Sequence, residues 1–112
     1  MNLPEGVQVV HLYGALFFGA TPKLDALAEA VAPGTRAVVL ELHRLVSIDN
    51  TGLDGLEQLH RSLARQGVAL VLCDLNDQPA SLVRRSGFDQ LLGPTRLFAT
   101  LHEALAHWSS PL

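Results

Sequence analysis

Short apolar runs alternate with amphipathic stretches along this chain. Residues 7–12 are rich in β-branched side chains and partly alternate between apolar and polar, which predicts a strand. The dipeptide Tyr13-Gly14 predicts a turn, so residues 15–18 are expected to form a second short strand antiparallel to the first. Two nearly continuous apolar runs, 37–42 and 68–72, predict buried central strands.

Apolar residues at helical spacing fill the intervals between these strands. A helix is expected to begin at Thr21-Pro22, because proline is tolerated at the first helical position, and to end at Pro33-Gly34. Residues 51–66 carry a stripe of leucines and predict a further helix, with residues 43–48 as the loop before it. Shorter elements complete the pattern: a helix at 79–86 that Gly87 ends, a brief strand at 97–98, and a last helix at 100–108 with a capping box of Thr100 and Glu103.

The order of these elements predicts the fold class. It indicates an α/β domain with a mostly parallel sheet of four to five strands, an antiparallel N-terminal strand pair and about four helices. The 112 residues contain no linker, internal repeat or low-complexity segment, so a single domain over residues 1–112 is expected. The loops around Asp49, Asp74 and Gly93 follow strands, and ligands or partners usually bind at that edge of such a sheet.

The segment Ile48-Asp49-Asn50-Thr51-Gly52-Leu53 places a hydroxyl residue where a helix is expected to begin. One interpretation is structural: Thr51 caps the helix, and Asp54 completes a capping box. The other is functional, because the free N–H groups and positive partial charge of a helix start would stabilise a phosphate on Thr51. That phosphate would add up to about two negative charges beside Asp49. Both interpretations stay open, and the candidate surface consists of Asp49, Asn50, Thr51 and Gly52.

Composition narrows the possible functions. Hydrophobic residues make up 48% of the chain and charged residues 17%, which indicates a compact domain rather than a disordered one. The formal net charge is -3 and no cluster of basic residues stands out, so nucleic-acid binding has no electrostatic support. Cys73 is the one cysteine, so we expect a small core residue in a reducing, cytoplasmic setting. The sequence shows no signal peptide and no membrane-spanning run.

No arrangement of residues predicts catalysis. Neither a Gly-x-Ser-x-Gly elbow nor a glycine-rich phosphate loop with lysine is present. Asp74 and Asp77 follow a predicted strand and serve either as a cap and a turn acid or as the lining of a binding edge. The histidines lack the spacing of a metal site, so we expect no enzyme activity, no metal and no cofactor. These scattered histidines are His11, His43, His60, His102 and His107.

Phe17 and Phe18 are candidates for contact with a partner. Consecutive residues of a strand point to opposite faces, so one ring can enter the core while the other lies against a helix, a partner or solvent. Trp108 near the C-terminus raises the same question. An exposed aromatic ring at either place would mark a contact surface.

A strand, the motif Asp49-Asn50-Thr51-Gly52-Leu53, a leucine-striped helix, Gly67 and the strand 68–72 together resemble a STAS domain. This family is shared by SulP-type sulfate and anion transporters and by bacterial anti-sigma-factor antagonists. The likeness extends from about Val7 to Trp108. Two later segments also fit it, Arg84-Arg85-Ser86-Gly87-Phe88 and Leu101-His102-Glu103-Ala104-Leu105.

The segment after the first strand distinguishes two branches of the family. Antagonists usually have a Gly-Glu-Leu-Asp type segment there, whereas Gly14-Ala15-Leu16-Phe17-Phe18 is similar to the Gly-Pro-Leu-Phe-Phe pattern of transporter STAS domains, with Ala15 in place of proline. The resemblance therefore implies a non-catalytic regulatory domain on the cytoplasmic side of a SulP-type transporter. Its first partner would be the transmembrane domain of the same protein, and Met1 would be an internal boundary rather than a native start.

Two alternatives follow from the same resemblance. In antagonists, the residue that matches Thr51 is phosphorylated by the anti-sigma factor, a kinase, so the chain is alternatively a free-standing partner switch. Some STAS domains are thought to bind guanine nucleotides, which makes weak nucleotide binding a third hypothesis. A further cytosolic protein partner is compatible with each of these. The transported anion, the oligomeric state and the identity of such a partner do not follow from the sequence.

Overall fold

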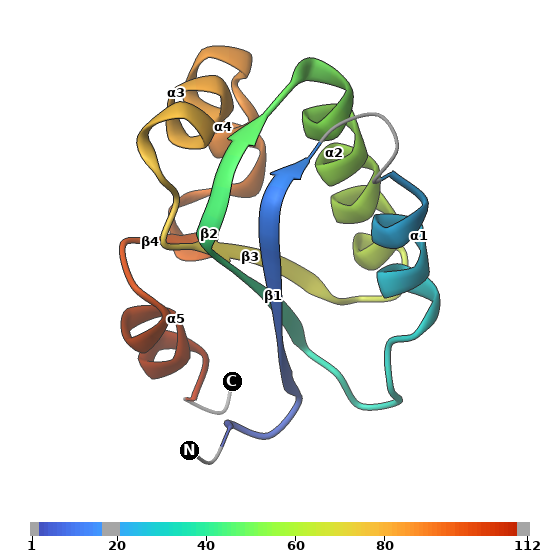
Figure 1. Cartoon of the computed structure of the whole chain (residues 1–112). Coiled ribbons are helices and arrows are strands. Elements are labelled where there is room, and N and C mark those ends of the chain that lie inside the picture. Colours follow the sequence, from blue (N-terminus) through green and yellow to red (C-terminus); the bar gives the residue numbers. More distant parts are fainter. Residues whose placement is uncertain (1–2, 17–20, 110–112) are drawn as a thin grey trace.

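The structure, a computed structural model, describes residues 3–16 and 21–109, without the side chains of residues 15–16 and 21–23. Strands and helices alternate along the described chain (Figure 1). Their bounds, in chain order, are β1 (Val7–Leu16), α1 (Thr21–Glu29), β2 (Ala37–Ile48), α2 (Asn50–Ala64), β3 (Ala69–Cys73), α3 (Asp77–Ser86), α4 (Phe88–Leu92), the 3-10 helix η2 (Pro94–Arg96), β4 (Leu97–Phe98) and α5 (Leu101–Trp108).

Four strands form one sheet in the order β1-β2-β3-β4, and every neighbouring pair within the described residues is parallel. Parallel neighbours require crossover connections, and helices supply them here. The predicted α/β class and four strands are therefore confirmed. Five α-helices lie in the described part of the chain, one more than predicted, because the short helix α4 follows Gly87 directly.

The expected antiparallel pair at the N-terminus is wrong. Residues 7–16 form a single strand that runs through Gly14 and pairs with β2 along its whole length. Register shifts lie between His11 and Tyr13 and between Gly14 and Ala15. Gly14 has φ +74, a left-handed conformation that glycine adopts at little cost in a bulge as well as in a turn. The glycine therefore bends the strand without reversing it.

The expected loop at residues 43–48 is also wrong, because β2 continues to Ile48. The last partner of β2 on β3 is Glu41, opposite Cys73, whereas β1 accompanies β2 as far as Ile48. Three apolar side chains of this extension are buried, and these are Leu42, Leu45 and Ile48. Beyond Glu41, β2 thus has a neighbouring strand on one side only among the residues that the structure describes.

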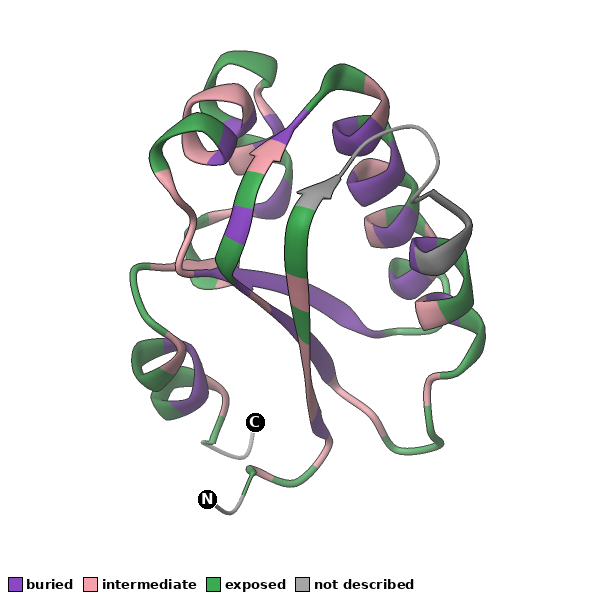
Figure 2. Cartoon of the chain, in the orientation of Figure 1, coloured by how far each residue is buried: buried purple, intermediate pink, exposed green. Residues whose placement is uncertain are grey.

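Helices cover the two faces of the sheet unequally (Figure 2). Apolar residues of α1 to α4 pack on one face and form the larger core. Among the described helices, α5 is the one that packs on the other face, with Ala104 and Leu105 against small residues of the strands. Trp108 is half-buried there, and its indole Nε1 donates to the Thr95 carbonyl oxygen at 3.2 Å. Cys73 is fully buried in this smaller core, as predicted.

Arg36 joins the two ends of the described chain at the amino end of β2. Its guanidinium Nη2 donates to the Glu5 carbonyl oxygen at 3.0 Å and to the Trp108 carbonyl oxygen at 2.7 Å. The backbone N–H of Arg36 also donates to the Gly6 carbonyl oxygen at 2.6 Å. The segment before β1 and the end of α5 are therefore held by one side chain.

Candidate functional site

Residues 49–52, which are the N-cap and the first residues of α2, are named the cap loop. Asp49 is the N-cap of α2: its backbone is extended, and its carboxylate Oδ1 accepts the Gly52 N–H at 2.7 Å. Its carbonyl oxygen accepts the Leu53 N–H at 2.9 Å, the first bond of the helix. The expectation that Thr51 caps this helix is wrong, because the helix begins one residue earlier and the stronger capping residue, aspartate, precedes it.

Thr51 lies in the first turn of α2 and is half-buried. Within the described part of the chain, no hydrogen bond holds its hydroxyl. Asp49 and Asn50 beside it are exposed, whereas Gly52 faces the interior. The four predicted residues thus lie together at one helix start, but the expectation that Gly52 is a surface residue is wrong, because it is buried against the core.

Two amide side chains from the start of α3 hold the end of β2, and we name Asn76 and Gln78 the amide clamp. Asn76 Nδ2 donates to the carbonyl oxygens of His43 at 2.8 Å and Leu45 at 2.9 Å. Gln78 Oε1 accepts the Ile48 N–H at 2.8 Å, and its Nε2 donates to the Ile48 carbonyl oxygen at 3.0 Å. The clamp therefore occupies the side of β2 that has no neighbouring strand, directly before the cap loop.

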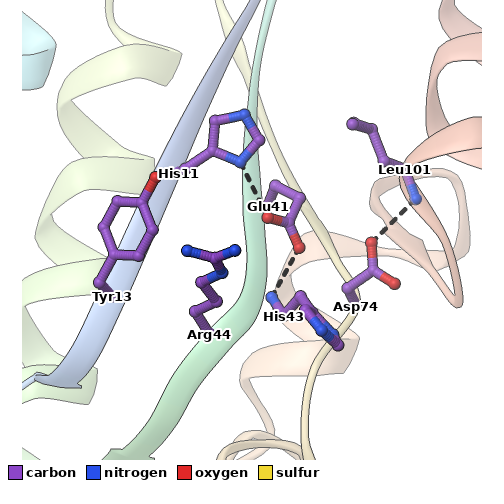
Figure 3. Close-up of a pocket in the computed structure, with 7 residues that line it drawn as sticks. All are labelled: His11, Tyr13, Glu41, His43, Arg44, Asp74 and Leu101. Carbon is purple, nitrogen blue, oxygen red and sulfur yellow. Dashed lines mark hydrogen bonds and ion pairs between the residues drawn. The ribbon is translucent and has the colours of Figure 1, made fainter.

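A groove of about 420 Å³ lies on the face of the sheet that α5 only partly covers (Figure 3). Tyr13 is 62% exposed on its wall, and the Arg44 guanidinium carbon lies 5.7 Å from the centre of the Tyr13 ring. That distance permits a cation–π contact. The groove is lined by His11, Tyr13, Glu41, His43, Arg44, Asp74 and Leu101.

His11 and Glu41 form a hydrogen bond across β1 and β2 in this groove, with His11 Nδ1 2.8 Å from Glu41 Oε2. The other carboxylate oxygen of Glu41 accepts the His43 backbone N–H at 2.7 Å. Burial alone would raise the pKa of the Glu41 carboxyl, but the His11 hydrogen bond, the His43 N–H and the two nearby imidazoles outweigh it. The pKa of Glu41 therefore lies below its ordinary value, and the carboxylate stays charged at neutral pH.

Asp74 connects the groove to α5. Its carboxylate Oδ2 accepts the Leu101 N–H at 3.0 Å, so it helps to cap that helix from 27 residues away. Asp74 thus caps α5 and not the helix that follows it in sequence, and the same side chain lines the groove. Next to it, burial first and then the charges of Asp74 and Glu41 raise the pKa of the Cys73 thiol to about 12. Cys73 is thus not a nucleophile at neutral pH.

His60 is the exception among the histidines. Four are exposed, whereas His60 is half-buried on α2 and its ring packs edge-on against Phe88 with centroids 6.3 Å apart. Burial and the positive charges of Arg96 and Arg61 lower the pKa of His60 below its ordinary value. His60 is therefore neutral at physiological pH and acts as a packing residue.

The sequence signals for the two sites differ in strength. The Asp49–Gly52 motif located the cap loop directly, but neither the clamp nor the groove was predicted. Glu41 could have indicated the groove, since it is the one charged residue in an apolar run. His11 and Tyr13 are likewise polar or amphipathic side chains in the otherwise apolar strand β1. Phe17 and Phe18 lie outside the described residues, so their contact with a partner stays a prediction.

Two further findings bear on the site. Among the side chains that the structure describes, no group of three or more His, Cys, Asp or Glu residues is arranged to hold a metal ion. No helix over residues 3–16 and 21–109 combines the length and apolar character that crossing a membrane requires.

Comparisons of the sequence with known proteins give one family. The STAS domain profile matches residues 1–104. The chain is 27% identical over 81 residues to low affinity sulfate transporter 3 of Stylosanthes hamata, which is 72% of this chain but 13% of the transporter. It is 27% identical over 92 residues to sulfate transporter 1.3 of Arabidopsis thaliana, 82% of this chain and 14% of that protein. The chain thus spans about one seventh of the length of these curated relatives.

Solved structures share the fold. A sulfate transporter family protein from Wolinella succinogenes superposes with a TM-score of 0.87 at 28% identity, over 96% of this chain and 88% of that one. The Bacillus anti-sigma factor antagonist SpoIIAA, in its unphosphorylated form, gives a TM-score of 0.68 at 19% identity, over 99% of this chain and 96% of that one. The murine anion transporter Slc26a9 gives 0.76 at 19% identity, over 95% of this chain and 18% of the transporter. The last two show a common fold alone.

Proposed function

This chain belongs to the STAS domain family, and from that membership we propose that it is a non-catalytic regulatory and interaction domain of a SulP-type anion transporter. The observation that carries the proposal is the match to sulfate transporters over a small part of their length. The likeness to the Wolinella succinogenes protein supports the same branch, because it combines 28% identity with near-complete coverage of both chains. The domain would work at the cytoplasmic face of the membrane that holds the transporter.

The first partner in this proposal is the transmembrane domain of the same transporter. The cap loop is the contact surface that we favour, since Asp49 and Asn50 are exposed and fixed by the start of α2. Phe17 and Phe18 would add apolar contact. A cytosolic protein that competes for this surface would regulate transport without any chemical step in the domain.

Cell fractionation tests the proposal. An antibody raised against this domain is used to probe membrane and soluble fractions of cells that express the native gene. A band several times larger than 12.1 kDa in the membrane fraction is the expected result. A soluble band near 12.1 kDa would contradict the transporter assignment and favour a free-standing protein.

The second candidate is an anti-sigma-factor antagonist that a kinase switches at Thr51. The position of the Thr51 hydroxyl in the first turn of a helix favours it, because a phosphate there would be stabilised by the helix start. The phosphate would also stand close to the exposed Asp49, and the added repulsion would alter the cap loop.

Incubation with a cognate kinase and ATP, followed by mass spectrometry, tests this candidate. Phosphate should be found on Thr51, and a Thr51→Ala protein should remain unlabelled. Equal labelling of the two proteins would eliminate Thr51 as the switch.

Weak binding of a guanine nucleotide is the third candidate. The sequence contains no glycine-rich phosphate loop with lysine to support tight binding. Titration calorimetry at millimolar nucleotide is the direct measurement, and a flat trace would remove this candidate.

A further inference from the structure

We propose that Asn76 and Gln78 position the cap loop by holding the end of β2 directly before it. The geometric part of this inference concerns the fold alone. Its consequence for a partner rests on the proposed function, in which the cap loop is the contact surface.

The need for the clamp arises from the unequal lengths of the strands. β2 has 12 residues and β3 has 5, so within residues 3–16 and 21–109 no strand pairs with the last part of β2 on the β3 side. Backbone N–H and C=O groups on that side still require hydrogen-bond partners where they are shielded from water. Helix α3 lies beside this end of β2 (Figure 1), and its first residues supply the partners.

The Asn76 side chain bonds β2 and does not cap its own helix. Asn76 is the N-cap residue of α3, a position where asparagine normally accepts an N–H of its own helix. Its side chain makes no such bond and instead donates to the carbonyl oxygens of His43 and Leu45. The amide therefore serves β2 in preference to α3.

Gln78 determines the orientation of the residue before the cap. The N–H and C=O of one strand residue point to the same side, so Ile48 directs both groups at α3 and bonds both with the single Gln78 amide. Only an amide side chain offers a donor and an acceptor in this geometry. Asp49 follows Ile48 directly, so a fixed Ile48 peptide aims the Asp49 carboxylate at the Gly52 N–H.

The clamp therefore fixes the backbone directly before the exposed residues Asp49 and Asn50. In the proposed function, these two residues belong to the surface that contacts the transmembrane domain of the same transporter.

Amide hydrogen–deuterium exchange of the 112-residue chain, measured by NMR, tests the inference. The key variant is Gln78→Met, which keeps the length and helix propensity of the side chain but removes both hydrogen bonds. Gln58→Met on the exposed side of α2 is the matched control. We expect the Ile48 and Gly52 amides to exchange roughly 2- to 10-fold faster in Gln78→Met only, the effect of losing one hydrogen bond.

The variant Gln78→Glu separates the two bonds. Its carboxylate still accepts the Ile48 N–H but cannot donate to the Ile48 carbonyl oxygen, so exchange at Ile48 should lie between wild type and Gln78→Met. The amides of α5, which packs on the other face of the sheet, should keep their wild-type rates, whereas the Leu40 and Leu70 amides of the central strands report any change in global stability.

Three outcomes would overturn the inference. Faster exchange at Ile48 with unchanged Gly52 would mean that the clamp holds β2 but does not position the cap. Unchanged rates at both amides would mean that Gln78 holds neither. Equally faster exchange at the α5 amides would mean that the substitution acts on the whole domain and not on the cap loop. Because the measurement needs no partner, its failure is distinct from failure of the transporter assignment, which cell fractionation tests.

Discussion

The N-cap of α2 gives a direct test of how the cap loop is built. The change is Asp49→Ala, which removes the carboxylate that accepts the Gly52 N–H at 2.7 Å. Asp49 is exposed, so the substitution leaves no cavity and the effect is confined to the helix start. The comparison is Thr51→Ala, two residues on, because the sequence alone predicts Thr51 as the cap.

Two contributions determine the expected magnitude. Loss of an N-cap hydrogen bond costs about 0.5–2 kcal/mol. Loss of a negative charge at a helix start costs about 0.3–1 kcal/mol, with the lower part of that range suited to an exposed residue. We therefore expect Asp49→Ala to lower the free energy of unfolding by about 1–2 kcal/mol. For a domain of this size, that corresponds to a fall in Tm of about 4–8 °C.

Thr51→Ala should behave differently. It removes no cap in the structure, and alanine has the higher helix propensity, so the free energy of unfolding should change by less than about 0.5 kcal/mol. Asp49→Asn is the intermediate case: the amide oxygen can still cap, and only the charge is lost, so the cost should be a few tenths of a kcal/mol.

Urea denaturation followed by circular dichroism measures these differences, since the change in midpoint at constant m gives the change in stability. The expected order of stability is Thr51→Ala close to wild type, then Asp49→Asn, then Asp49→Ala. A Thr51→Ala protein that is as unstable as Asp49→Ala would refute the assignment of the cap.

Further predictions concern the core, the buried thiol and the groove. Leu63→Ala should lower the free energy of unfolding by about 2–5 kcal/mol in the same assay, because Leu63 is fully buried in the larger core; a loss below about 1 kcal/mol would contradict its place there. Cys73 should resist a thiol-specific reagent at pH 8 until urea is added, because burial raises its pKa to about 12; rapid labelling of the folded protein would contradict this. Glu41 has a lowered pKa when folded, so its contribution to stability is present above the unfolded value near 4.5 and is lost as the pH falls through the folded value. The difference in urea midpoint between wild type and Glu41→Gln should therefore shrink between pH 7 and pH 3, and a constant difference would argue against the His11 pair as its source.

Local pattern was sufficient for most of the fold. The apolar runs and leucine stripes located the central strands and the main helices, because each of these signals lies within one segment. Gly87 ends α3 with φ +82, and the Thr100 hydroxyl accepts the Glu103 N–H at 3.1 Å, as predicted. Both features depend on neighbours in the sequence.

The errors arose where a partner distant in sequence decides the structure. A glycine at φ +74 suits a turn and a bulge equally, and only pairing with β2 shows that Gly14 lies inside a strand. The polar residues of 43–48 read as a loop, because the support from β1 and from the clamp is 30 or so residues away.

In the candidate site, too, features set by neighbouring residues were predicted and features set by distant residues were not. The cap loop was located from a continuous motif, although the choice of capping residue was wrong by two positions. The amide clamp could not be predicted from the sequence, because Gln78 and Ile48 are 30 residues apart and meet only once the fold brings α3 beside β2. The groove needed β1, β2, β3 and α5 to be assembled before its lining residues met.

The hydrogen bonds from Arg36 to both ends of the described chain have a consequence for protein engineering. Because one guanidinium bonds the Glu5 and Trp108 carbonyl oxygens, the points where the chain enters and leaves the fold are neighbours. A short peptide could therefore join them, and new termini could be opened in an exposed loop elsewhere to give a circular permutant. The same proximity makes the fold suitable as a cassette that can be spliced into a host protein without forcing the host's two flanking segments apart.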